Sequence, residues 1–337
     1  KRANWFTIEL DQTNQERWTL SIKMAVVMDP IESINPIKDS TLAMMQAAQA
    51  RNFEVSVIEL NGLYVQENEL WLHNQRVEFR TGADPWYDII STQHQQADQF
   101  DIILMRKEPP FDMDFVYATY LLEFAVRAGI PVLNNPGSIR DCNEKLFALQ
   151  FPQCTPENVV SADPEVLKQF HDKHRDVIFK PLDGMGGSSI FRVKENDSNR
   201  NVILETLTDL GQIQIMAQKF IPEISQGDTR ILLINGEPVP YGLARIPAAG
   251  ETRGNLAAGG SGIGRPLTDR DRWICDQVGP ALVEKGLYFV GIDVIGDYLT
   301  EINVTCPTCI RELDKAFDLD IAGDYLDFIE THLGSRH

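Results

Sequence analysis

Residues 22–135 alternate short apolar runs with helical periods, and this alternation limits the possible folds more than any other feature of the chain. Strands separated by helices indicate a parallel, doubly wound sheet. We therefore predict a Rossmann-like α/β domain over 22–140, with residues 1–21 as an extension outside the fold. The predicted strands are IKMAVVMD, FEVSVIEL, FDIILMR and IPVLNN, and the predicted helices are STLAMMQAAQARN and DFVYATYLLEFAVRAG.

The carboxyl ends of two of these strands carry polar residues. In doubly wound sheets, ligands bind beyond the carboxyl ends of the strands. Met28 and Asp29 follow the first strand, and Arg106 and Lys107 end another, just before two prolines. We interpret the two cations as contacts for an anionic group. The alternative is that they are ordinary surface charges.

The next segment, 141–221, reads as a compact α+β unit. It begins with a helix that carries Lys145, and it contains two strands joined by the glycine loop of VIFKPLDGMGGSSIFRV. The loop lacks the spacing of a P-loop and does not open a helix, as a dinucleotide-binding loop would. Glycines allow backbone N–H groups to approach phosphate closely, and Lys145 and Lys180 would add positive charge. The pattern predicts a flap over the phosphates of a nucleotide.

From residue 222 to 337 the signals are antiparallel. TRILLING and EPVPYGLARI flank Asn235-Gly236, a strong hairpin signal. The glycine-rich stretch 247–264 has no periodicity, and loops of that length in enzymes are often mobile lids. A helix and a second hairpin, YFVGIDVIGDYLTEINV, follow.

The second hairpin carries a candidate metal site. Glu301 and Asn303 are two residues apart on one strand, so their side chains share a face. An odd-numbered turn with a bulge would place Asp293 opposite Glu301, whereas a two-residue turn would send Asp293 to the other face. Carboxylates and an amide oxygen on one face suit Mg²⁺. The alternative is a solvated polar face.

Three arginines lie in the preceding segment. Arg230 and Arg245 fall on the first hairpin, and Arg253 falls in the predicted lid. Such a set is typical of a clamp for a transferring phosphoryl group. The alternative is that each arginine pairs with one of the abundant carboxylates.

Composition excludes several classes of protein. The chain has 31 Lys and Arg against 49 Asp and Glu, a net charge of −18, which disfavours nucleic acid as a partner. No apolar run approaches the ~18 residues that span a bilayer, and the first twenty residues have no apolar core of signal-peptide length.

The five cysteines argue against a disulfide scaffold and favour the cytoplasm. Cys306 and Cys309 have C-x-x-C spacing, but no further ligand pair for zinc lies near them.

Five long segments, in order, resemble the prokaryotic type of glutathione synthetase, an ATP-grasp ligase. The resemblance runs from about Ile22 to the C-terminus. It implies an ATP-grasp fold of mixed α/β and α+β character, preceded by the Rossmann-like domain. The segments are MRKEPPFD, RDCNEKLFALQF, KPLDGMGGSSIFRV, RIPAAGETRGNLAAGG and VGIDVIGDYLTEINVTCPTCIRE.

The resemblance implies a cytoplasmic enzyme that joins γ-glutamylcysteine to glycine through an acyl phosphate. The cofactor would be Mg²⁺, with Mn²⁺ as an alternative and two ions per site, and the assembly would be a homotetramer. Arg230, Arg245 and Arg253 would be catalytic, and Asp293, Glu301 and Asn303 would hold the metal. The implied ATP contacts are Lys145, Lys180, Gly184, Met185, Gly186, Gly187, Gln218, Lys219, Phe220 and Ile221, and the implied substrate contacts are Met28, Asp29, Arg106, Lys107, Thr305 and Cys306.

One residue departs from the family pattern. Cys306 stands where the family is expected to have serine, which puts in doubt a hydroxyl hydrogen bond from this position.

Two alternative functions were weighed against this one. A different carboxylate–amine ligase, such as a D-alanine ligase or a ligase adding glutamate to a protein tail, would use the same ATP site. A nucleotide-binding sensor without catalysis would not need the acidic face and all three arginines.

Overall fold

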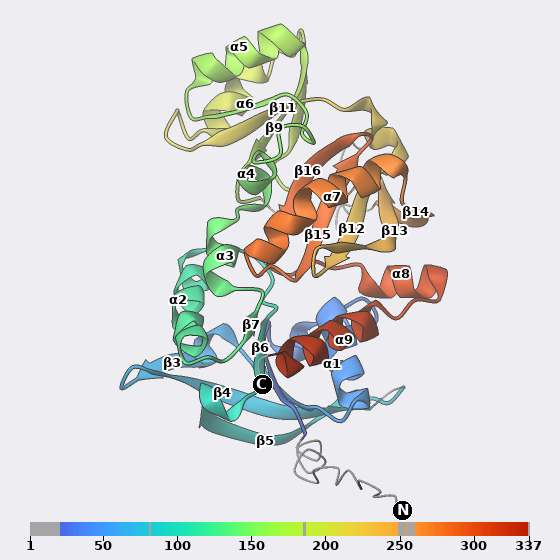
Figure 1. Ribbon diagram of the computed structural model, residues 1–337. Helices are drawn as coiled ribbons and strands as arrows, with labels where there is room; N and C mark the ends of the chain where they lie inside the picture. Colours follow the sequence, from blue (N-terminus) through green and yellow to red (C-terminus); the bar gives the residue numbers. More distant parts are fainter. Residues whose placement is uncertain (1–20, 81, 185–186, 249–253, 255–259, 336–337) are drawn as a thin grey trace, which may run out of the picture.

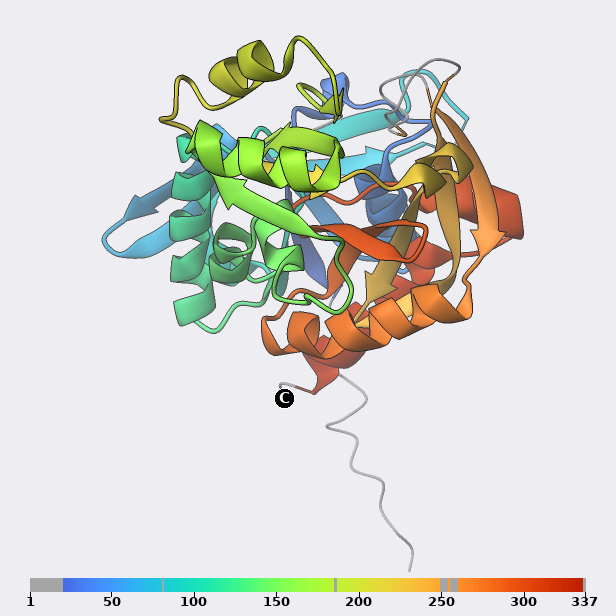
Figure 2. The same ribbon diagram turned by 90° about the horizontal axis from the view of Figure 1, so that it is seen from above.

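The computed structural model describes residues 21–335 except 81, 185–186, 249–253 and 255–259. The described part forms three sheets in three tiers, with the C-terminal sheet between the other two (Figure 1). Figure 2 looks down on the tier that carries α5, which lies over the rest of the molecule. No helix in these residues is both long and apolar enough to cross a membrane.

The first sheet is mixed, which corrects the prediction of a parallel sheet. β1, β2, β6 and β7 are parallel as predicted, but three strands that the sequence analysis missed extend the sheet with antiparallel pairing. The order is β3-β4-β2-β1-β6-β7, with β5 paired to β4. The strands are β1 (Lys23–Val27), β2 (Glu54–Ile58), β3 (Leu63–Gln66), β4 (Glu69–Phe79), β5 (Tyr87–Gln96), β6 (Ile102–Met105) and β7 (Val132–Leu133).

Helices cover both faces of this sheet. α1 contributes Leu42 and Met45 to the apolar core on one face, and α2 contributes Phe115 and Leu122 to the core on the other. Asp39 and Asp112 accept N-cap hydrogen bonds at the starts of α1 and α2. The elements are α1 (Ser40–Ala50), α2 (Met113–Arg127), α3 (Pro136–Asp141) and the 3₁₀ turns η3 (Ile31–Ser33), η4 (Leu60–Gly62) and η5 (Ala97–Gln99).

The second sheet is antiparallel in the order β10-β9-β11-β8 and has its own small core around Leu167, Phe179 and Leu204. β9 and β10 are the two strands predicted to flank the glycine loop. The elements are α4 (Glu144–Ala148), β8 (Asn158–Ser161), α5 (Pro164–His174), β9 (Asp176–Pro181), β10 (Phe191–Lys194), α6 (Arg200–Leu207) and β11 (Ile215–Lys219).

The third sheet has the order β14-β13-β12-β15-β16, and both predicted hairpins are present. Asn235 and Gly236 take positive φ in the first turn. The predicted loop 247–264 is partly wrong, because Ser261 begins a strand that pairs with Ile246. The elements are η6 (Pro222–Gln226), β12 (Asp228–Ile234), β13 (Glu237–Ile246), β14 (Ser261–Pro266), α7 (Asp269–Glu284), β15 (Phe289–Ile295) and β16 (Tyr298–Asn303).

The last two helices, α8 (Ile310–Phe317) and α9 (Ile321–Gly334), return to the first sheet. α9 lies beside α1 (Figure 1), where Arg51 pairs with Asp327 at 2.6 Å. Tyr325 is buried in the same apolar core as Leu42 of α1. The C-terminal segment therefore joins the first and third tiers.

Candidate active site

A cavity of about 360 Å³ lies where the three tiers meet. Gln218, Phe220 and Ile221 line one part of it, and the loop after β16 lines another. Of the predicted site residues, the cavity is lined by Lys180, Gly184, Gly187, Gln218, Phe220, Ile221, Arg230, Arg245, Glu301, Asn303, Thr305 and Cys306.

The β15–β16 hairpin brings Asp293 and Glu301 together by a route that neither predicted alternative described fully. The turn has only two residues, since Ile295 pairs with Tyr298. A bulge then shifts the register by one residue, so that Asp293 pairs with Glu301 instead of Thr300. The Thr300 hydroxyl donates to the Asp293 carbonyl at 3.1 Å. The bulge thus restores the shared face that a two-residue turn would remove.

Two buried arginines surround Asp293. Arg230 donates from Nε to Oδ1 at 2.5 Å and from Nη2 to Oδ2 at 2.9 Å, and Arg245 Nη2 lies 2.9 Å from Oδ2. Burial alone would raise the pKa of Asp293, but the two guanidinium groups outweigh it and hold this pKa below its usual range. The carboxylate is therefore ionised. Both arginines pair with carboxylates, as the alternative interpretation expected, and both also line the cavity.

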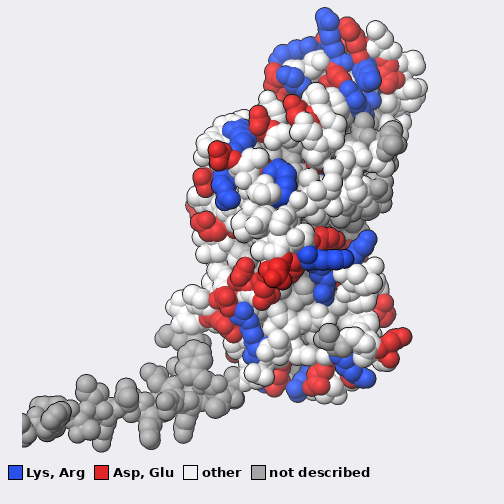
Figure 3. All heavy atoms as spheres, turned by 90° about the vertical axis from the view of Figure 1, so that its right-hand side faces the viewer, with Lys and Arg blue, Asp and Glu red and all other residues white. Residues whose placement is uncertain are grey.

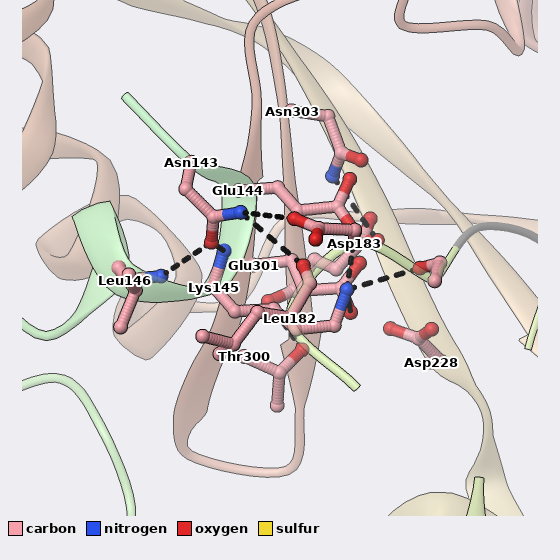
Figure 4. A network of polar contacts seen from close by, with 12 residues as sticks. Asn143, Glu144, Lys145, Leu146, Leu182, Asp183, Asp228, Thr300, Glu301 and Asn303 are labelled. Atoms are coloured by element: carbon pink, nitrogen blue, oxygen red, sulfur yellow. Dashed lines mark hydrogen bonds and ion pairs between the residues drawn. The ribbon is translucent and has the colours of Figure 1, made fainter. Parts of the chain in front are cut away.

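Two lysines, Lys145 and Lys180, lie at the base of the glycine loop, and Figure 4 shows Lys145 beside Glu144 and Glu301. Lys145 donates to the Gly184 carbonyl at 3.1 Å, pairs with Glu144 and lies 3.5 Å from Glu301. Lys180, on β9, is buried, and burial lowers its pKa. Burial, followed by the charge of Glu301, raises the pKa of Glu144 to about 7. The site therefore holds buried charge of both signs around the loop.

Asp228 and Glu144 are cavity residues that the sequence analysis missed. Asp228 Oδ2 accepts from Arg245 at 2.5 Å, but Oδ1 is buried and has no hydrogen-bond partner among the described residues. Burial raises the pKa of Asp228 to about 7. Its position two residues before Arg230 on one strand was a usable signal, because such residues share a face. The signal for Glu144 was its position directly before Lys145, which the sequence analysis had already selected.

Other predicted residues lie elsewhere. Lys219 points away from the cavity and pairs with Glu157 at 2.9 Å. Lys107 pairs with Asp29 at 2.8 Å, and Met28 is buried beside a separate, smaller cavity.

Arg106 is also absent from the residues that line the cavity. It donates to the Thr41 hydroxyl and the Pro307 carbonyl and packs over the Phe289 ring.

The substrate roles of Met28, Asp29, Arg106 and Lys107 therefore stay predictions. Met185, Gly186 and Arg253 lie outside the described residues.

The acidic face fits a divalent cation. Glu301 and Asn303 offer oxygen atoms to the cavity, and Asn303 Nδ2 donates to Asp293 Oδ2 at 3.3 Å, which leaves the amide oxygen for another partner. Burial first, and then the charges of Glu301 and Asp293, raise the pKa of Glu144, so a cation beside these carboxylates would favour their ionised forms. Within the described ranges no group of three or more His, Cys, Asp or Glu side chains is placed to hold a metal, so the candidate set depends on the amide of Asn303.

Gly291 controls the position of Arg230. A Cβ atom at this position would lie 2.8 Å from Arg230 Cδ and 2.9 Å from Pro307 Cβ. We expect Gly291→Ala to displace the guanidinium group and to lower kcat about 10²-fold, since misplacement by an ångström has effects of that size. Steady-state kinetics would measure this, with thermal denaturation to confirm folding. Gly262→Ala, where only the Leu243 side chain must move, is the control, and equal kcat in both variants would contradict the prediction.

A glycine loop between two strands, facing an antiparallel sheet with an acidic and arginine-lined surface, defines an ATP-grasp enzyme. Solved structures agree on the fold. The ATP-grasp ligase PsnB with minimal precursor, Mg and ADP superposes with a TM-score of 0.61 at 16% identity, over 92% of this chain and 98% of that chain. The D-cycloserine synthetase DcsG gives a TM-score of 0.63 at 13% identity, over 92% and 99%.

Sequence comparison then identifies the family. Residues 22–140 match the N-terminal domain of prokaryotic glutathione synthetase, and residues 144–318 match its ATP-grasp domain. A glutathione synthetase of Pseudomonas aeruginosa is 57% identical over 94% of this chain and 100% of its own length. One of Vibrio cholerae is 55% identical over 93% and 98%, and one of Shigella flexneri is 53% identical over 93% and 99%. The chain belongs to the prokaryotic glutathione synthetase family and is an ATP-dependent ligase.

Proposed function

We propose that this enzyme joins γ-glutamylcysteine to glycine and releases glutathione, ADP and phosphate. The observation that carries the proposal is the convergence, in one cavity, of a glycine loop with Lys180, two arginines and the oxygen atoms of Glu301 and Asn303. Lys145 lies at the same loop, where it donates to the Gly184 carbonyl. The γ-phosphoryl group would pass to the cysteinyl carboxylate of the dipeptide. The glycine amine would then attack the acyl phosphate and displace phosphate.

The position of each residue in the cavity suggests its role in this reaction. The adenine would lie against Gln218, Phe220 and Ile221, which line the cavity next to the loop. Lys145 and Lys180 would contact the phosphates beneath the glycine loop. Arg230 and Arg245 would stabilise the negative charge of the acyl phosphate and its precursor. The assignments of Met185, Gly186, Lys219 and Arg253 rest on the sequence resemblance.

Asp293, Glu301 and Asn303 would hold Mg²⁺, or Mn²⁺ in its place, and the resemblance suggests two ions. When bound, the metal would neutralise phosphate oxygens. Asp293 keeps both its oxygen atoms in hydrogen bonds to arginine, so it would also fix the guanidinium groups relative to the metal. This arrangement supports one connected site for the metal and the transferred group.

Each of the three tiers would have its own function. Residues 22–140 would bind substrate, 141–221 would form the nucleotide lid, and 222–337 would hold the metal and the arginines. We further propose, from the resemblance, a homotetramer, and from the sparse cysteines a cytoplasmic location. Lys and Arg are interspersed with Asp and Glu on the face in Figure 3, which agrees with small molecules, rather than nucleic acid, as partners.

ADP release with Mg-ATP, γ-glutamylcysteine and glycine, omitting each in turn, tests the function. Release that requires all three, with glutathione as product, is the expected result. Release with another acceptor, such as D-alanine or a glutamate-terminated peptide, would keep the ligase chemistry and overturn the substrates. ATP binding without release under any combination would favour a sensor.

A Cys306→Ser variant tests whether the departure from the family pattern at this position affects activity. Its thiol lies 3.8 Å from the Thr41 hydroxyl, and burial raises its pKa to about 11, so it is neutral at physiological pH. A neutral serine hydroxyl can occupy the same place. We expect Cys306→Ser to keep kcat/KM within about twofold. Elemental analysis should find no stoichiometric zinc, and one zinc per chain would show that the C-x-x-C pair binds metal.

A further inference from the structure

Glu108 is the only charged residue of the first tier that lines the large cavity in the described part of the chain. It follows β6, two residues after the buried Arg106, and Pro109 lines the cavity beside it. The sequence analysis selected the two cations before it. The residue that reaches the cavity is instead a carboxylate.

The charges next to Glu108 are paired with one another, whereas the Glu108 carboxylate has no ion-pair partner among the described residues. Asp29 pairs with Lys107 and also accepts from the Glu108 backbone N–H at 3.0 Å, which fixes the backbone at this point. Lys107 Nζ donates to the Glu108 carbonyl at 2.6 Å. No described residue forms an ion pair with the Glu108 carboxylate, and its side chain is exposed to the cavity.

The electrostatic surroundings favour a cation at this place. Partial burial raises the pKa of Glu108, and Asp29 and Asp39 add to the effect, while Arg106 and Lys107 oppose it. Burial and the two neighbouring carboxylates thus both disfavour the ionised form of Glu108. An ammonium group would supply that charge and form a charge-assisted hydrogen bond.

The loop after β16 connects Glu108 with the arginines. Pro307 lies against Gly291, beside the Arg230 side chain. Cys306, next in the loop, is close enough to Glu108 for that carboxylate to raise its pKa. Thr305, Cys306 and Thr308 line the same cavity as Glu108 and the two arginines. The loop after β16 is therefore a wall of this cavity that lies close to Glu108 through Cys306 and close to Arg230 through Pro307.

The proposed reaction fixes which ammonium can lie there. Reacting atoms must approach within about 3.5 Å, so the glycine amine and the cysteinyl carboxylate must both lie near Arg230 and Arg245. The remaining part of the dipeptide, its γ-glutamyl end, must extend away from them. That end carries an α-ammonium group, and Glu108 is the first-tier carboxylate, among the described residues, that lines the same cavity.

We propose that the Glu108 carboxylate binds the α-ammonium group of the γ-glutamyl end of the dipeptide and so selects this substrate. The inference rests on the proposed function and adds a residue that determines specificity. It assigns Glu108 to substrate recognition and not to the bond-forming steps.

Paired substrates test this role. Glutarylcysteine has the chain of γ-glutamylcysteine with the α-ammonium group replaced by hydrogen. We expect the wild-type enzyme to prefer γ-glutamylcysteine in kcat/KM by about 10- to 100-fold, the range for one hydrogen bond to a charged group. Glu108→Gln should lose most of this preference by raising KM for γ-glutamylcysteine, with KM for ATP and glycine unchanged. Glu108→Asp, which keeps the charge, should retain part of it.

Glu78→Gln, at an exposed position on β4, is the control for the loss of one surface charge and should keep the full preference. A Glu108→Gln variant that keeps the preference would overturn the inference, as would one that raises KM for glycine instead. Wild-type turnover of γ-glutamylcysteine is measured first. Its absence would contradict the proposed function itself, so the two failures are distinguishable.

Discussion

Arg230→Ala is expected to lose about 10²- to 10³-fold in kcat, the usual effect of removing a group that stabilises charge in the transition state. The guanidinium group lines the cavity and is held by two hydrogen bonds to Asp293. These two hydrogen bonds fix the direction of the guanidinium group toward the cavity. ADP release measured at saturating substrates would give the loss, and KM for ATP should change much less.

Stability must be separated from catalysis in this variant. Removing one partner of a buried ion pair commonly costs roughly 3–5 kcal/mol, although Arg245 would still compensate Asp293. Arg265→Ala is the matched control, because Arg265 pairs at 2.6 Å with the buried Asp271 on the same tier but does not line the cavity. We expect it to lower the unfolding temperature while keeping kcat. A folded Arg230→Ala enzyme with near-normal kcat would remove Arg230 from the mechanism.

Local patterns predicted the elements of this fold well, and tertiary pairing was predicted less well. Asn235-Gly236 marked the first hairpin because only a few residues accept positive φ at both turn positions. β4 and β5 were missed because they are rich in polar residues and lack a clear apolar run. The return of α9 to α1 depends on contacts across almost the whole chain, which no local pattern encodes.

In the candidate site, too, local sequence patterns were informative and contacts between distant segments were not predicted. Short motifs were enough to select Gly184, Gly187, Arg230 and Arg245, which line one cavity, while their roles stay predictions. The pairing of Asp293 with Glu301 was left open, since a bulge at Thr300 cannot be distinguished from a simple turn by spacing. Glu108 was missed because the direction of each side chain after β6 depends on Asp29, which lies on another strand end.

Glu301→Gln is expected to weaken metal binding at least 10- to 100-fold, since even a residue that only supports a metal ligand has effects of that size. Glu301 is the carboxylate of the acidic face that lines the cavity directly, whereas Asp293 lies behind it in contact with the arginines. Titrations of Mg²⁺ or Mn²⁺ in the presence of ATP would measure both binding and ADP release. Glu284→Gln, on the exposed end of α7, is the control and should bind metal normally.

The same variant makes a second prediction that does not depend on metal. The charge of Glu301 contributes to raising the pKa of Glu144 to about 7, so its removal should lower that pKa toward the ordinary value of glutamate. A carboxyl group with a raised pKa favours folding below its unfolded-state pKa, and this contribution is lost as the pH rises through about 7. Glu301→Gln should therefore reduce the loss of stability between about pH 5 and pH 8 in the metal-free protein, as measured by denaturant unfolding. Unchanged metal affinity together with an unchanged pH profile would show that Glu301 is solvated and belongs to neither the metal site nor the charge cluster.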